Sequence, residues 1–183
     1  MIYSYSDLIS IEKNERKARE AIASFKYRKI APGLYTDSAN GENYLNIIFN
    51  RYENITVTMQ TAFEYYDLTD LNYGKYTIAF THGSRIVKDD KIKQFFVDKD
   101  IYDVGRIKVK KNGFEFYIYN KERLLIELVR NKTKLPYDYY KEIVNSYRLL
   151  IKEGLIDTSL LLKYAKSFKR GNNIIEKIME VVA

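Results

Sequence analysis

The chain has 183 residues, a net charge of +7 from 31 basic and 24 acidic side chains, and no cysteine. This length suits one or two domains that bury their own cores. The lack of cysteine excludes disulfides, thiolate metal sites and a cysteine nucleophile, and a single histidine, His82, argues against histidine-based metal centres and triads. Because no apolar run reaches the ~18 residues of a membrane span and no signal peptide is recognisable, we expect a soluble, cytoplasmic protein without metal or other cofactor.

The first 36 residues have the order of a helix-turn-helix followed by a wing. A short capped helix is expected at residues 6–9, and after a turn Asn14 can cap a second helix that runs to about Ser24. One face of that helix is apolar, formed by Ala18, Ala21, Ile22 and Phe25. Two short strands are then predicted around the turn at residues 31–33, where Pro32 and Gly33 have the required backbone preferences.

Basic side chains gather on this segment, which holds seven basic and four acidic residues. Arg16, Arg19, Ala23 and Lys26 form a stripe at helical spacing, and the first strand of the wing contributes Arg28 and Lys29. A basic recognition helix beside a basic wing is typical of proteins that bind duplex DNA. An amphipathic helix with an ordinary solvated face is the alternative. The candidate DNA-binding residues are Lys13, Arg16, Lys17, Arg19, Lys26, Arg28 and Lys29.

A polar stretch at residues 36–43 predicts a domain boundary, so we expect a DNA-binding domain at 1–38 and an α/β domain at 39–183. Residues 44–49 suit a short helix or a strand, and Thr58 is expected to cap a helix that ends at Tyr66. The predicted strands of the second domain are residues 55–57, 76–80, 93–97, 106–110 and 114–119, and Asn112-Gly113 joins the last two as a hairpin.

The remainder is predicted to be helical. Asn120 should cap a helix to Val129, and further helices are expected at about residues 137–152, 159–168 and 173–182, with Gly154 and Gly171 between them. The predicted fold class is therefore α+β: a small, shortened winged helix-turn-helix, then a mixed β-sheet domain with a C-terminal helical tail.

Two features of the sequence are candidates for catalysis. Gly83-Ser84 follows a strand, as phosphate-binding loops do, but the spacing of a known phosphate loop is missing. Asp89 and Asp90 are adjacent, so they point to opposite sides of an extended chain. We expect no enzymatic activity and name no catalytic residue. A nucleotide-processing enzyme is the least favoured alternative.

A polar motif opens the helix that follows the hairpin. Asn120 suits the cap, and Glu122 in the first turn suits the helix dipole, whereas Arg123 is less expected there. Two interpretations are open: Glu122 and Arg123 form a polar network buried against the sheet, or they belong to a surface for a partner.

These segments together resemble the AbiEi family, the antitoxin half of bacterial type IV toxin–antitoxin (abortive infection) systems. The resemblance covers most of the chain and is carried by residues 19–35, 55–70, 119–128 and 162–165. The third segment resembles the signature Tyr-Asp-x-Glu-Arg-Thr-hydrophobic-x-Asp, with Asn120 and Glu127 at the two Asp positions. The chain departs from the family in lacking a full helix ahead of the helix-turn-helix and a Gly at residues 66–68.

The resemblance implies an antitoxin that also represses its own operon. The N-terminal domain would bind inverted repeats in the promoter. The second domain, which holds the Glu122-Arg123 motif, would oppose a cognate nucleotidyltransferase-like toxin without a stable complex. Such a role in phage defence needs no cofactor and no membrane. A stand-alone winged-helix regulator without a toxin is the alternative.

Overall fold

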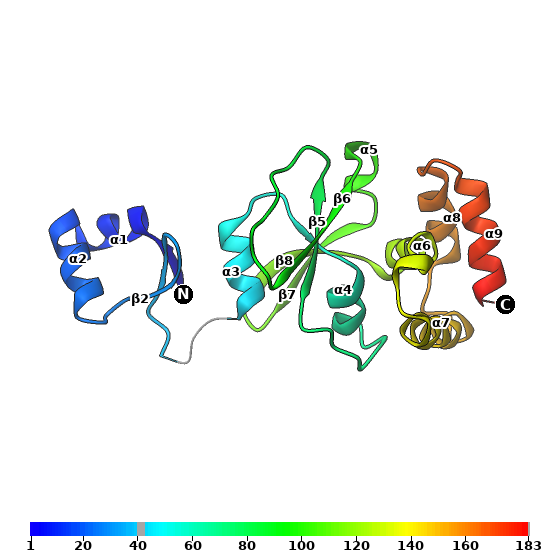
Figure 1. Cartoon of the computed structure of the whole chain (residues 1–183), viewed down its shortest axis with the longest axis horizontal. Coiled ribbons are helices and arrows are strands. Elements are labelled where there is room, and N and C mark those ends of the chain that lie inside the picture. Colours follow the sequence, from blue (N-terminus) through cyan, green and yellow to red (C-terminus); the bar gives the residue numbers. More distant parts are fainter. Residues whose placement is uncertain (40–42, 183) are drawn as a thin grey trace. The chain divides into compact units, whose positions relative to one another are not determined.

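The computed structural model describes residues 1–39 and 43–182 and divides into two compact units, Met1–Asn54 and Ile55–Ala183 (Figure 1). This division comes later in the chain than the boundary predicted after residue 38, since helix α3 (Tyr44–Arg51) belongs to the first unit. Residues 40–42, in the middle of the polar stretch, lie outside the described residues. The α+β class is confirmed, with a separate sheet in each unit.

The first unit has the predicted order of helix, turn, helix and hairpin, together with a short strand that the sequence did not reveal. Its sheet has the order β1-β3-β2 with antiparallel pairing throughout. Gly33 (φ 75°) makes the turn between β2 and β3, as predicted. The elements are β1 (Ile2–Ser4), α1 (Tyr5–Glu12), α2 (Glu15–Ala23), β2 (Arg28–Ala31) and β3 (Leu34–Thr36).

Side-chain caps fix where the two helices begin. The Ser4 hydroxyl accepts a hydrogen bond from the Asp7 amide (3.1 Å), and the Asp7 carboxylate accepts one from the Ser4 amide (2.7 Å), which forms a capping box for α1. Asn14 caps α2, as predicted, by accepting from the Lys17 amide at 2.8 Å. The helix-turn-helix geometry therefore follows from local polar groups.

A small apolar core joins the helices of the first unit to its sheet. Leu8, Ala18, Ala21 and Tyr27 form its centre. Phe25 was expected on this face, but that prediction is wrong, because its side chain is 79% exposed. Helix α2 ends at Ala23, and the amide of Lys26 bonds the Ala21 carbonyl at 3.0 Å. Phe25 (φ 60°) takes the left-handed position of this Schellman turn, which rotates its side chain out of the apolar face.

The second unit is built on a mixed sheet with the order β6-β5-β4-β8-β7. Central β4 pairs antiparallel with β5 and parallel with β8, and β5 pairs parallel with β6. The predicted hairpin is confirmed: β7 and β8 meet at Asn112 (φ 52°) and Gly113 (φ 78°), the two positive φ angles of a type I′ turn. The strands are β4 (Thr56–Val57), β5 (Tyr76–Thr81), β6 (Ile92–Val97), β7 (Arg106–Lys111) and β8 (Phe114–Tyr119).

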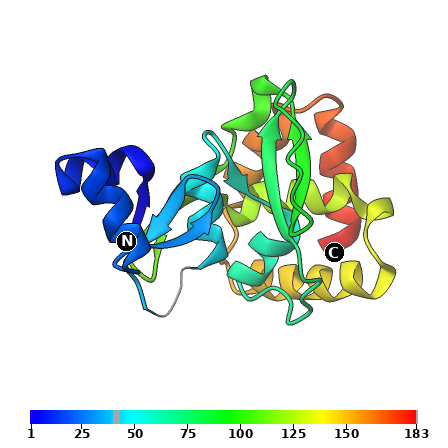
Figure 2. The ribbon, with the colours of Figure 1, turned by 60° about the vertical axis from the view of Figure 1, so that its left-hand side comes forward.

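Helix α6 is central to the helical part of this unit. It packs against α4, α8 and α9, and Figures 1 and 2 show α6–α9 grouped beside the sheet. Asn120 caps α6 as predicted, whereas Thr58 precedes α4 without a side-chain capping bond. No helix in the described ranges has the length and apolar character to cross a membrane. The helices are α4 (Met59–Tyr65), α5 (Lys99–Tyr102), α6 (Lys121–Arg130), the 3₁₀ turn η1 (Lys132–Lys134), α7 (Tyr137–Lys152), α8 (Thr158–Lys166) and α9 (Gly171–Val182).

Candidate nucleic-acid interface

The outer face of α2 carries two exposed arginines. Arg16 and Arg19 border a depression of about 450 Å³ together with Glu15, Glu20 and Ala23. Their side chains are 75% and 70% exposed, and each is paired with a carboxylate one turn away on the same helix. The Arg16 guanidinium lies 2.5 Å from Glu20, and Arg19 bonds Glu15. The predicted stripe is present, but acidic side chains partly neutralise it.

These pairs do not prevent the arginines from binding a nucleic acid. Exposed ion pairs spaced i,i+4 on a helix contribute only about 0.3–0.5 kcal/mol. A phosphate or a guanine edge offers Arg a bidentate partner that can replace the carboxylate. Arg19 also donates to the Tyr5 hydroxyl at 3.3 Å, which orients it from α1, and this hydroxyl together with Glu15 raises the pKa of Arg19.

Lys26 does not continue the helical stripe, which corrects the prediction from spacing. It follows the end of α2, and its ammonium lies 2.6 Å from the Glu12 carboxylate and 5.4 Å from the centre of the Tyr27 ring. This hydrogen bond raises the pKa of Lys26 and lowers the pKa of Glu12. Lys26 therefore fastens the end of α2 to α1.

The two basic residues of the wing have different surroundings. Arg28 and Lys29 are consecutive on β2, so their side chains leave opposite faces of the strand. Arg28 donates to the Ser38 and Ala39 carbonyls, the latter at 2.8 Å, and so holds the chain that follows β3. Lys29 is exposed, and its ammonium forms no hydrogen bond or ion pair with another described residue. Of the two, Lys29 is the one that offers a charge to a ligand.

Two further lysines lie beside the helix-turn-helix. Lys13 (φ 65°) ends α1, is exposed, and has no hydrogen bond or ion pair among the described residues. Lys17 is exposed in the first turn of α2, where its charge helps to lower the pKa of Glu12. Three groups result. Lys13, Lys17 and Lys29 are available, Arg16 and Arg19 hold exchangeable carboxylates, and Lys26 and Arg28 are engaged in the fold.

In the second unit, the motif at the start of α6 forms a buried ionic cluster. Arg123 is 0% exposed, and its Nε donates to Glu127 Oε1 at 3.0 Å. Its Nη1 donates to the carbonyls of Ile101 (2.7 Å) and Val104 (3.0 Å). Arg130 also donates to Glu127, at 3.0 and 3.2 Å. One carboxylate therefore joins two arginines.

Glu122 and Arg123 are both buried, as one of the two open interpretations has it, but they do not pair with each other. Neighbouring residues of a helix point about 100° apart, whereas residues four apart share a face. Glu122 accepts instead from the Asp157 amide at 3.1 Å, and so helps to position the start of α8. Because Arg123 is fully buried, the geometry favours the structural interpretation of this residue. Its true partner was signalled in the sequence by the i,i+4 spacing to Glu127.

The residues considered for catalysis make local contacts in turns. The Ser84 hydroxyl lies 3.2 Å from the Thr81 hydroxyl, and the Asp89 carboxylate accepts from the Lys91 amide at 3.0 Å. Both groups therefore stabilise turns. Within the described part of the chain, no three His, Asp or Glu side chains are gathered as a metal site would need.

No protein-family model matches the chain, and no curated protein matches it. The function is therefore inferred from the residues described above and from the resemblance of the sequence motifs.

Proposed function

We propose that the protein is a DNA-binding antitoxin that represses its own operon and opposes a nucleotidyltransferase-like toxin. The observation that carries the DNA-binding part is the outer face of α2, where Arg16 and Arg19 are exposed between available lysines. The antitoxin part is supported by the resemblance to the AbiEi family alone.

In the proposed complex, α2 lies in the major groove. Arg16 and Arg19 exchange their carboxylates for guanine edges or phosphates, which gives sequence preference. Lys13 and Lys17 contact phosphates beside the groove, and Lys29 contacts the backbone from the wing. Lys26 and Arg28 keep their contacts within the unit.

The salt dependence of binding tests this assignment. Three to five neutralised phosphates give a slope of about −3 to −5 for log K against log salt on promoter DNA. Lys17→Gln should make the slope shallower by about 1, whereas Lys163→Gln, the same charge change on α8, should leave it unchanged. A slope near zero for the unaltered protein would contradict DNA binding.

Base reading is tested separately. Arg16→Gln or Arg19→Gln should cost about 1–3 kcal/mol on the operator and relax sequence preference, whereas Lys29→Gln should weaken all duplexes alike. If the arginine variants also weaken every duplex by the same factor, α2 is not the recognition helix.

Co-expression with the neighbouring toxin-like gene tests the antitoxin part. The full chain should restore growth. The fragment 55–183, which lacks every candidate DNA-binding residue, should also restore growth although it does not shift promoter DNA. Repression by the full chain without rescue from any neighbouring gene product would favour the stand-alone regulator.

A further inference from the structure

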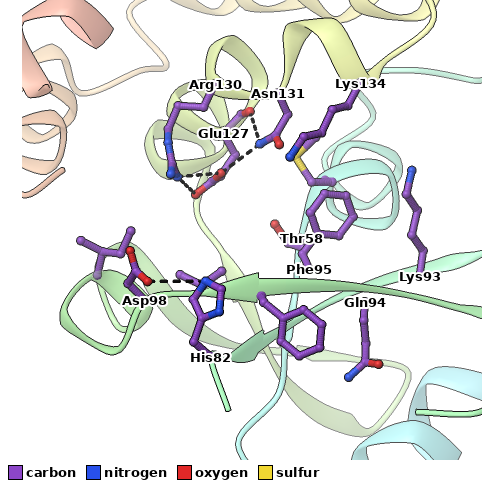
Figure 3. Close-up of a pocket in the computed structure, with 14 residues that line it drawn as sticks. Thr58, His82, Lys93, Gln94, Phe95, Asp98, Glu127, Arg130, Asn131 and Lys134 are labelled. Atoms are coloured by element: carbon purple, nitrogen blue, oxygen red, sulfur yellow. Dashed lines mark hydrogen bonds and ion pairs between the residues drawn. The ribbon is translucent and has the colours of Figure 1, made fainter. Parts of the chain in front are cut away.

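A cavity of about 510 Å³ opens in the second unit between the edge strand β6 and the end of α6 (Figure 3). Its lining comes from segments far apart in the sequence, including the start of α4, the end of β5, β6 and the η1 turn. The volume lies in the range of small-ligand sites, about 300–1,000 Å³. The proposed DNA contacts use none of these residues.

Three basic side chains of the lining keep hydrogen-bond donors for a ligand. Lys134 is exposed, and its ammonium makes no hydrogen bond or ion pair with another described residue. The Lys93 ammonium lies over the Phe95 ring, 5.5 Å from its centre, and makes no hydrogen bond or ion pair with the described chain. Arg130 uses Nη1 for Glu127, so Nε and Nη2 have no hydrogen-bond partner in the described chain. These donors together suit a group with several negative oxygens.

The Glu127 carboxylate in the lining is compensated. It lies against Arg130 and is also bonded by the buried Arg123, so two guanidinium charges face one carboxylate. Asp98 Oδ1 lies 3.5 Å from His82 Nε2, and Figure 3 marks this contact. Anion binding near Glu127 is therefore not opposed by an unpaired negative charge.

A buried amide adds a polar contact of a different kind. Asn131 is 8% exposed, and its Nδ2 donates to the Glu127 carbonyl at 2.9 Å and to Glu127 Oε2 at 3.2 Å. These bonds fix the orientation of the amide. They leave Oδ1 without a hydrogen-bond donor in the described chain, in a residue that lines the cavity. A base amine or a ribose hydroxyl could donate to it.

An aromatic ring completes the lining. Phe95 lies among the labelled side chains of the cavity (Figure 3), on the same face of β6 as Lys93. Phe96 follows it on the strand and leaves the opposite face, where it stacks with His82 at a centroid distance of 6.0 Å and an interplanar angle of 26°. Aromatic rings beside basic groups are the combination that binds a nucleobase and its phosphates.

We propose that this cavity binds a nucleoside triphosphate, with the phosphates at Lys93, Arg130 and Lys134 and the base against Phe95. The geometry supports binding and assigns no chemical step to the site. This inference is independent of the proposed function, because a protein that binds no DNA would keep the cavity.

Isothermal titration calorimetry of the full chain with ATP, CTP, GTP and UTP tests the proposal. Lys134→Gln should weaken binding about tenfold or more, the loss expected for one charge-assisted hydrogen bond. Lys152→Gln makes the same charge change on an exposed residue of α7 outside this cavity, and should leave affinity unchanged. Because the Lys134 ammonium has no hydrogen bond or ion pair with the described part of the chain, its variant should remain folded by circular dichroism.

A second arm separates the base from the phosphates. Tripolyphosphate should bind about tenfold more weakly than the nucleotides, and Phe95→Leu should abolish most of this difference. No heat of binding at millimolar nucleotide would overturn the proposal, as would equal weakening by Lys134→Gln and Lys152→Gln. If a short single-stranded RNA binds there far more tightly than any triphosphate, the mononucleotide assignment is wrong.

Discussion

Removing the Glu127 carboxylate should destabilise the second unit far more than altering Glu122. In Glu127→Leu, the Arg123 guanidinium stays buried with the carbonyls of Ile101 and Val104 as its hydrogen-bond acceptors. Breaking a buried ion pair from one side costs about 3–5 kcal/mol. The rings of Tyr119 and Phe168, 4.5 and 4.4 Å from the guanidinium carbon, offset part of this loss, so we expect about 3 kcal/mol.

The matched control is Glu122→Gln, which keeps an oxygen for the Asp157 amide and should cost about 0.5–1.5 kcal/mol. Urea denaturation of the full chain, followed by far-ultraviolet circular dichroism, measures both values. The double variant Arg123→Met, Glu127→Leu should recover much of the single loss, because neither charge is then buried alone. A loss below about 1 kcal/mol for Glu127→Leu, or a double variant that loses the sum of the singles, would refute the reasoning.

Three further predictions concern packing, acid stability and autonomy. Gly105→Ala should lower the free energy of unfolding by about 2–4 kcal/mol in thermal denaturation, since Gly105 has φ 73° and a Cβ there would lie 2.4 Å from the Arg123 Cβ. The control Gly154→Ala, at φ 70° with open space around it, should lower it by about 1 kcal/mol. Hydrogen bonds from Ser4 lower the pKa of Asp7 in the folded protein. Their stabilisation is therefore present above the pKa that Asp7 has in the unfolded chain, and it is lost as the pH falls through the pKa that Asp7 has in the folded chain, so the first unit should become less stable below about pH 4. Ser4→Ala should reduce this pH dependence of stability in a circular dichroism titration. The fragment 55–183 should unfold cooperatively, as a unit with its own sheet and helices.

Features determined by near neighbours in sequence were predictable. Asn14 and Asn120 cap their helices through amides three residues away, and Asn112-Gly113 carries the backbone preference of its turn. Two short elements were missed: β1 has three residues and α5 has four, and neither carries a turn or an apolar run that marks it in the sequence. Such elements depend on pairing or packing with distant parts of the chain.

The sequence predicted which basic residues belong to the candidate DNA-binding site, but not which acidic side chains and carbonyls they contact. Helical spacing correctly placed Arg16 and Arg19 on one face of α2. It wrongly added Lys26 to that face, because the Schellman turn that ends α2 is not visible in the periodicity of the sequence. The engagement of Arg28 by carbonyls ten and eleven residues away depends on the path of the chain after β3. The cavity beside β6 was not foreseen, since its lining meets only in the folded unit.

The two-residue strand β4 has a consequence for how the second unit folds. The β7–β8 hairpin closes a two-residue loop and can form within microseconds, whereas the pairing of Val57 with Ile118 must close a loop of about sixty residues. Among the described strands, the backbone pairing between the β5–β6 half and the β7–β8 half runs through Thr56 and Val57. We therefore expect β4 to dock late, after the rate-limiting step, so that substitutions at Val57 mainly speed unfolding while those in the hairpin slow folding.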